Sequence, residues 1–210
     1  MKKLYELKRS NLENLLFISK KLSKFKIFCF YGTLLGLTRE NDILLGDDDI
    51  DLLVDIKYKK QVLFKLSKLK EFKLNKKKNN KYFIQLIKNK KHIKTFVDIY
   101  FYINRKNKKY IEEKHNFLSA INIQRLSLHI PKKYIFPLQI NKNFNEVLVP
   151  KSAYQICKFL YGKNWRMPLR KNSGYRMEII NNKPKLIKRS YIGALKRRLI
   201  NFITRKFIKK

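Results

Sequence analysis

The chain carries seven aspartates, and six of them fall between positions 42 and 55. Four of these, Asp47, Asp48, Asp49 and Asp51, occupy a stretch of five residues. In a chain with a large excess of positive charge, such crowding of carboxylates costs repulsion unless a cation lies among them. The stretch is either a solvated acidic turn or a site for a divalent metal ion, and the geometry of a β-strand favours the metal site.

Asp49 and Asp51 are separated by one apolar residue, Ile50, at the start of a β-rich run. Because side chains alternate between the two faces of a strand, both carboxylates project from the same face. Magnesium and manganese ions prefer oxygen ligands, commonly a few carboxylates together with substrate phosphate. The spacing therefore predicts a Mg²⁺ (or Mn²⁺) site at Asp49 and Asp51.

Asp98, the seventh aspartate, stands alone in the apolar segment 95–102, TFVDIYFY. A carboxylate inside so apolar a strand is costly unless it is paired, ligated or placed at a functional site. If this strand lies beside residues 49–54, Asp98 supplies a third carboxylate, as a metal ligand or as the base that takes a proton from an attacking hydroxyl. A hydrogen-bonded structural aspartate is the alternative.

A glycine-containing segment, residues 32–39 with the sequence GTLLGLTR, precedes the aspartates. A strand followed by Gly32 and Thr33 at the start of a helix is typical of a phosphate-binding turn, because glycine allows close backbone approach and the helix offers free N–H groups. Arg39 adds a planar guanidinium suited to phosphate. The segment is neither a Walker A loop nor a dinucleotide fingerprint.

Hydrophobic periodicity predicts the elements that would position these residues. We expect helices over residues 4–24, 57–70 and 153–160, with a short helix starting at 34–37. We expect strands over residues 26–31, 48–55, 82–87 and 95–103, and shorter ones at 124–130, 135–138 and 146–149. Residues 73–81 are typical of a polar loop, and residues 104–120 are ambiguous. This order predicts an α/β (α+β) fold with a mixed sheet flanked by helices.

The composition excludes several classes of protein but does not identify a binding partner. The chain has 210 residues, 51 Lys+Arg against 15 Asp+Glu, and a net charge of +36. Such a charge suits nucleic acid or an anionic membrane, but codon bias toward lysine explains it equally well. Two cysteines give no disulfide framework or four-ligand zinc site, and no segment resembles a secretory signal or a membrane span. We therefore expect a cytoplasmic protein.

The C-terminal residues 183–210 contain eleven Lys/Arg and no acid. From Tyr191 to Arg205, apolar and basic residues fall on opposite halves of a helical wheel. This pattern predicts a basic amphipathic helix, which either packs on the domain or binds the anionic inner face of a membrane. We therefore divide the chain into a catalytic domain, residues 1–182, and a basic extension, residues 183–210.

Three motifs together resemble the LicD family, which includes fukutin-type enzymes. The segment YGTLLGLTRENDILLGDDDIDLLV at 31–54 is similar to the family's core motif, although Gly46 stands where the family usually has tryptophan. TFVDIYFY resembles the family's Val-Asp-Ile-Phe strand. Phe136-Pro137-Leu138, Val149-Pro150 and Tyr161-Gly162 with Trp165 and Pro168 resemble its closing segment.

This resemblance implies a nucleotidyltransferase core of the DNA polymerase β type. It also implies transfer of a substituted phosphate, such as phosphocholine or an alditol phosphate, from a CDP-linked donor to a glycan or glycolipid hydroxyl, as in lipopolysaccharide modification. The implied metal ligands are Asp47, Asp49, Asp51 and Asp98, and the implied donor-binding residues are Gly32, Thr33, Gly36 and Arg39. Tyr31, Tyr161 and Trp165 are either near the substrate or ordinary core aromatics.

Two other functions fit part of the sequence. A nucleotidyltransferase acting on RNA, DNA or protein shares the Gly-Thr and Asp-x-Asp pattern, but the position of Arg39 and the Tyr-Gly-x-x-Trp segment argue against it. We therefore do not expect a nucleic-acid partner. A basic scaffold without activity is the other alternative, and the intact set of aspartates argues against that function.

Overall fold

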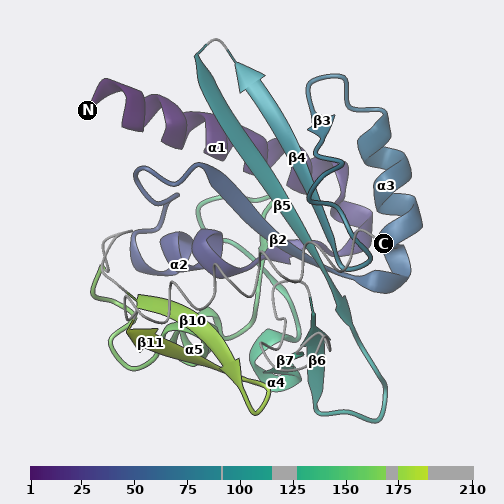
Figure 1. Ribbon diagram of the computed structural model, residues 1–210, viewed down its shortest axis with the longest axis vertical. Helices are drawn as coiled ribbons and strands as arrows, with labels where there is room; N and C mark the ends of the chain where they lie inside the picture. The colour runs from purple at the N-terminus through teal and green to yellow at the C-terminus, as the bar shows by residue number, and fades with distance from the viewer. Residues whose placement is uncertain (91, 115–126, 169–174, 189–210) are drawn as a thin grey trace, which may run out of the picture.

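The computed structural model describes residues 1–90, 92–114, 127–168 and 175–188 of the chain, shown in Figure 1. The helices are α1 (Lys2–Lys21), α2 (Tyr31–Arg39), α3 (Lys59–Ser67), α4 (Lys132–Ile135) and α5 (Ala153–Tyr161). The strands are β1 (Phe28–Cys29), β2 (Asp49–Asp55), β3 (Lys73–Leu74), β4 (Phe83–Lys90), β5 (Ile93–Ile103), β6 (Tyr110–Glu113), β7 (Leu128–Pro131), β8 (Gln139–Ile140), β9 (Leu148–Val149), β10 (Tyr175–Ile180) and β11 (Lys183–Lys188).

A mixed sheet forms the centre of the molecule. In the described residues it has nine strands, with the order β3-β4-β5-β2-β1-β9-β8 and with β6 and β7 continuing from the end of β5. β2 pairs in parallel with β5, whereas β1 pairs antiparallel with β2 and β4 antiparallel with β5. The expected mixed α/β fold, a sheet flanked by helices, is therefore confirmed, and the two long apolar strands lie side by side at its centre.

The two faces of the sheet are covered by different helices. Asn14 of α1 donates a hydrogen bond to the Thr95 hydroxyl (2.9 Å), and the Lys59 ammonium of α3 lies 5.5 Å from the centre of the Phe101 ring. Thr95 and Phe101 share one face of β5, because side chains alternate along a strand. The start of α2 instead contacts Asp51, on the opposite face. The carboxylates therefore face away from α1 and α3.

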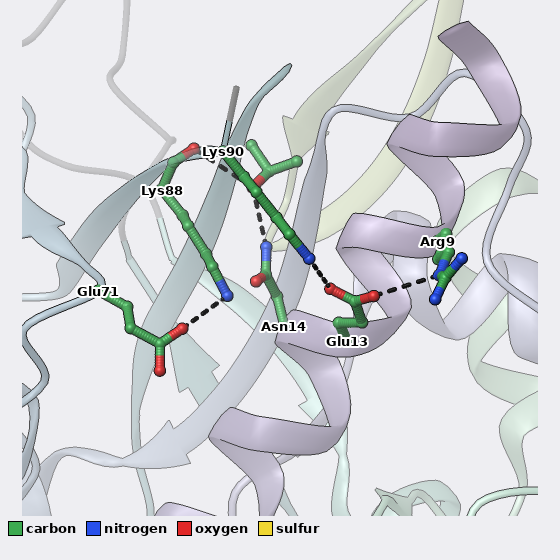
Figure 2. Close-up of polar contacts among 7 residues, drawn as sticks. Arg9, Glu13, Asn14, Glu71, Lys88 and Lys90 are labelled. Atoms are coloured by element: carbon green, nitrogen blue, oxygen red, sulfur yellow. Dashed lines mark hydrogen bonds and ion pairs between the residues drawn. The ribbon is translucent and has the colours of Figure 1, made fainter. Parts of the chain in front are cut away.

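Ion pairs join α1 to the hairpin formed by β4 and β5 (Figure 2). The Lys90 ammonium lies 2.9 Å from a Glu13 carboxylate oxygen, and the Arg9 guanidinium lies 3.3 Å from the other. Lys88 makes a similar contact with Glu71 at 2.9 Å. Exposed pairs of this kind stabilise a fold by less than about 1 kcal/mol each, so the apolar core carries most of the stability.

Several short elements differ from their predicted positions. Residues 135–138 are not a strand: α4 ends at Ile135 and a cis peptide bond joins Phe136 to Pro137. Proline cannot donate to a strand ladder, and the pairing strand β8 begins only at Gln139. Tyr31 opens α2 rather than ending a strand, and β6 lies in the stretch that the sequence left ambiguous.

The start of the basic extension is a strand. Residues 183–188 form β11, which pairs antiparallel with β10 in a separate hairpin. The predicted amphipathic helix from Tyr191 to Arg205 lies outside the described residues. No helix within the described ranges is both long enough and apolar enough to cross a bilayer.

Candidate functional site

Three aspartates meet on one face of the two central strands. The parallel register pairs Asp51 of β2 with Asp98 of β5, and Asp49 lies two residues before Asp51 on the same face. One carboxylate oxygen from each of the three lies within 4.8 Å of the others. The two strands are therefore neighbours, which is the condition under which Asp98 adds a third carboxylate, and their pairing brings together side chains 47 residues apart in the chain.

Asp51 is held by hydrogen bonds from two directions. Its Oδ2 accepts from the backbone N–H of Gly32 at 2.9 Å, and its Oδ1 accepts from the Tyr100 hydroxyl at 3.1 Å. The side chain is buried, and burial together with the charges of Asp49 and Asp98 raises the pKa of Asp51 well above its usual range. An ionised Asp51 therefore needs a positive charge close by.

Asp98 is positioned by a buried amide from the next strand. Gln85 of β4 donates through Nε2 to Asp98 Oδ1 at 2.8 Å, while its Oε1 accepts from Asn75 Nδ2 at 2.6 Å. Asn75 thereby sets the orientation of the Gln85 amide, since a flipped amide would place oxygen against oxygen at Asp98 and nitrogen against nitrogen at Asn75. Burial raises the pKa of Asp98 to about 7, although the Gln85 hydrogen bond opposes this shift.

The preceding acidic residues form a second, overlapping group. Asp47, Asp48 and Asp49 also place carboxylate oxygens within 4.8 Å of one another. The backbone of this segment is fixed from α1, where the buried Asn11 donates through Nδ2 to the carbonyl oxygens of Asp47 (2.8 Å) and Asp49 (3.4 Å). All four predicted metal ligands therefore belong to one acidic region.

Gly32 permits the close packing of α2 on this region. A Cβ atom at this position would lie 3.1 Å from Oδ2 of both Asp47 and Asp51, which is tighter than ordinary van der Waals contact. Tyr31, just before it, has a φ of +41°, and its hydroxyl donates to the buried Glu113 of β6 at 2.9 Å. The start of α2 is thus held between the acidic region and β6.

The other predicted donor-binding residues lie along α2. The buried Thr33 hydroxyl accepts a hydrogen bond from the Asp51 N–H at 2.7 Å, so it joins α2 to β2. A Cβ at Gly36 would lie 2.6 Å from the Asp42 carbonyl oxygen, so that glycine allows close packing of the helix on the following loop. Arg39 contacts Glu40 at 2.8 Å, at the opposite end of α2 from Gly32.

The two aromatic residues near the end of α5 have different surroundings. Burial raises the pKa of Tyr161 well above its usual range, and the charges of Asp51 and Asp47 add to this shift, so Tyr161 lies within electrostatic reach of the carboxylates. Trp165 is buried and packs edge to face against Tyr154, with a ring separation of 5.4 Å. Of these two residues, Tyr161 is therefore the one whose pKa responds to the charges of the acidic region.

Several residues that support the site were not identified from the sequence. Asn11, Asn75, Gln85 and Glu113 all contact it from elements distant along the chain. Gln85 had a recognisable signal, because an amide in the apolar run Phe83–Leu86 requires a partner just as Asp98 does. Asn11 lies in the predicted helix 4–24 and Asn75 in the predicted polar loop 73–81, and an asparagine is an ordinary surface residue in either segment.

The chemistry of these side chains fits a divalent metal ion. Oxygens bound to one Mg²⁺ at about 2.1 Å lie no more than about 4.2 Å apart. Carboxylate oxygens of Asp49, Asp51 and Asp98 lie within 4.8 Å of one another, close to the separation that one shared ion requires. The group consists of carboxylate oxygens, which hard cations prefer as ligands.

Comparison with known proteins assigns the family. The family model described as LicD/FKTN/FKRP, nucleotidyltransferase domain, matches residues 24–151. Among curated proteins, none matches the chain significantly. The matched segment covers more than half of the chain and contains Gly32, Arg39 and all of the aspartates. The chain therefore belongs to the LicD family, and this membership indicates a transferase.

Proposed function

We propose that the protein is a metal-dependent phosphotransferase. It moves a substituted phosphate, such as phosphocholine or an alditol phosphate, from a CDP-linked donor to a hydroxyl of a glycan and releases CMP. The observation that carries this proposal is the meeting of Asp49, Asp51 and Asp98 within 4.8 Å, beside the first turn of α2. The donor class follows from the family resemblance.

The carboxylates would hold the metal ion in this reaction. Asp49 and Asp51 are the principal ligands, with Asp98 and Asp47 completing the set. When bound, Mg²⁺ or Mn²⁺ would neutralise the diphosphate oxygens and the charge that develops on departing CMP. Tyr100 and the Gly32 amide fix the rotation of the Asp51 carboxylate, so the ligand geometry is set before substrate arrives.

Asp98 is also suited to receive the proton of the acceptor hydroxyl. Gln85 engages Oδ1, which leaves Oδ2 as the oxygen that faces ligand or substrate. Burial raises the pKa of Asp98 to about 7 in the absence of metal, and a bound cation would lower it, so Asp98 would be ionised and able to accept the proton. The hydroxyl oxygen would then attack the phosphorus while the bond to CMP breaks.

The first turn of α2 would bind the donor diphosphate. The bare Cα of Gly32 brings the start of α2 close to the Asp47 and Asp51 carboxylates, so a diphosphate held by a metal ion there would lie beside the helix N-terminus, which favours negative charge. Thr33 uses an oxygen lone pair to accept from Asp51, so its hydroxyl proton remains for donation. Arg39 becomes a phosphate ligand if its guanidinium exchanges the Glu40 carboxylate for the diphosphate.

The test is a comparison of donors. The full chain is incubated with Mg²⁺, a glycan acceptor and one of CDP-choline, CDP-ethanolamine, CDP-glycerol, CDP-ribitol or a nucleoside triphosphate, and the products are identified by mass spectrometry. We expect CMP release and acceptor modification with a CDP-linked donor, and a loss of at least about 100-fold in Asp49→Asn, because charge neutralisation is the main source of catalysis in phosphoryl transfer.

Asp42→Asn is the matched control. Asp42 precedes the acidic region and forms a partly exposed ion pair with Lys8 at 2.8 Å, so its loss leaves the carboxylate cluster intact. Nucleotide addition from a triphosphate, with no use of CDP-linked donors, would replace the proposal by the nucleotidyltransferase alternative. Equal activity of Asp49→Asn and the unmodified chain would refute the assigned site.

A further inference from the structure

A strongly basic surface surrounds α3, on the face of the sheet away from the carboxylates. We define the α3 surface as residues 57–74, which contain seven lysines in 18 residues, against 51 Lys+Arg in the 210 residues of the chain. The one acid in this stretch, Glu71, pairs with Lys88 at 2.9 Å. All of these lysines except Lys59 are exposed. Basic residues are therefore about 1.6 times as dense here as in the chain as a whole.

An exposed aromatic residue stands among these lysines. The side chain of Phe64 is 60% exposed, and the Lys68 ammonium lies 4.1 Å from the centre of its ring. Phe64 lines two adjacent grooves of about 440 and 470 Å³. The first is lined mainly by apolar side chains, including Leu63, Phe72 and the exposed Leu74.

We propose that the α3 surface docks on an anionic lipid bilayer, with Phe64 and Leu74 entering the boundary between headgroups and acyl chains. Lysines that surround an apolar centre suit this partner, because their long stems cover apolar surface while their ammonium groups reach anionic headgroups. This surface consists of other residues of the sequence than the basic C-terminal residues 183–210, and the inference does not depend on the proposed reaction.

Charge and groove chemistry favour a bilayer over other occupants. A second copy of the chain would bring two lysine-rich surfaces together, which like-charge repulsion opposes. A single-stranded nucleic acid would pair with the lysines, but its bases would stack on aromatic rings. The first groove is instead lined largely by leucines. Leu86 lines the groove, and Gln85, its neighbour on β4, points to the opposite face with Asp98. Docking would therefore leave the carboxylates on the face away from the bilayer.

A fluorescent label at position 64 tests the contact directly. Both native cysteines, Cys29 and Cys157, are buried, so an environment-sensitive thiol probe on Phe64→Cys reports from that position. Ile140→Cys is the matched control, because Ile140 on β8 is 61% exposed, against 60% for Phe64. With vesicles of phosphatidylglycerol and phosphatidylcholine, we expect a blue shift and quenching by brominated acyl chains at position 64 only.

The partition coefficient provides a second measurement. Phe64→Ser should weaken binding of the full chain to the anionic vesicles about tenfold, because one aromatic side chain no longer leaves water. Ile140→Ser should leave it unchanged, and pure phosphatidylcholine should bind neither. An unshifted label at position 64 on vesicle-bound protein would overturn the proposal, since the chain would then attach through another surface. Quenching at position 64 by a second protein copy or by an oligonucleotide, and not by brominated lipid, would also overturn it.

Discussion

The two faces of β5 show opposite uses of one strand. Val97, Ile99 and Phe101 are fully buried in the apolar core under α1 and α3. Asp98 and Tyr100, which alternate with them, point to the other face, where both are buried among polar partners. The same backbone therefore supplies stability on one side and a costly cluster of carboxylates on the other.

This difference teaches that burial alone does not reveal the role of a residue. Apolar burial stabilises the fold in proportion to area removed from water, whereas a buried carboxylate destabilises it unless partners or a cation compensate. Changes on the apolar face should therefore alter stability first. Changes on the carboxylate face should alter activity first, and sometimes at little cost in stability.

The largest effect on stability should come from Ile99→Ala. Removing a fully buried isoleucine leaves a cavity, and such changes lower the free energy of unfolding by about 2–5 kcal/mol. We expect transferase activity per folded molecule to change little, because the side chain faces away from the carboxylates. Urea unfolding followed by circular dichroism measures the loss, and Ile140→Ala, at an exposed position, should show almost none.

The contrast between the faces of β5 also explains which parts of the site were predictable. Alternation along a strand was enough to place Asp49 with Asp51, and the apolar surroundings were enough to single out Asp98. The parallel register of β2 and β5 joins residues 47 positions apart. The pattern within each strand is compatible with this register but does not predict it. Asn75 and Glu113 contribute through contacts from segments that have no periodic pattern of their own.

The positions that were predicted wrongly have local physical causes. Residues 135–138 had strand-like composition, but the chain forms a single helical turn before the cis bond to Pro137. Tyr31 takes a positive φ that bulky residues rarely adopt, and its hydrogen bond to Glu113 stabilises that conformation. Local propensity carries no information about the contact of Tyr31 with Glu113 or about the cis peptide bond before Pro137.

The next effect is a dependence of stability on pH in the absence of divalent ions. Burial raises the pKa of Asp98 to about 7, so the folded chain keeps a proton that the unfolded chain releases near pH 3.8. The resulting stabilisation is complete at a pH below the pKa of Asp98 in the unfolded chain. It is lost as the pH rises through the pKa of Asp98 in the folded chain. Each pKa unit corresponds to about 1.4 kcal/mol, so the total approaches about 4 kcal/mol.

Urea unfolding at pH 4 to 8 in the presence of a chelator measures this dependence. The free energy of unfolding should fall toward pH 8, and added Mg²⁺ should restore part of the loss. Asp98→Asn should make the profile less steep, because the substituted amide does not titrate while the buried Asp51 still does. Parallel profiles for Asp98→Asn and the unmodified chain would contradict the assignment of this dependence to Asp98.

A smaller effect is expected from Gln85→Met, which keeps the side-chain volume but removes the amide. Asp98 then loses a fixed hydrogen bond, and we expect turnover to fall at least about tenfold, because a hydrogen bond to a charged group contributes about 1.5–3 kcal/mol. Steady-state kinetics should show the change in kcat rather than KM. Gln61→Met, at an exposed position on α3, is the control and should retain full turnover. Equal kinetics for both variants would mean that Gln85 does not position Asp98.

The smallest effect should come from Lys90→Met, away from both faces of the central strands. Lys90 and Glu13 form an ion pair at 2.9 Å, but both side chains are more than a third exposed, so water and salt screen the attraction. The pair lowers the pKa of Glu13, and its stabilisation is therefore present near neutral pH and lost as acid protonates the carboxylate. We expect less than about 0.5 kcal/mol by urea unfolding, and less again in 1 M salt. A loss above about 1 kcal/mol that persists in salt would show that the β4–β5 hairpin needs this ion pair for its stability. Stability would then depend on a polar contact at the edge of the sheet and not mainly on the apolar face of β5.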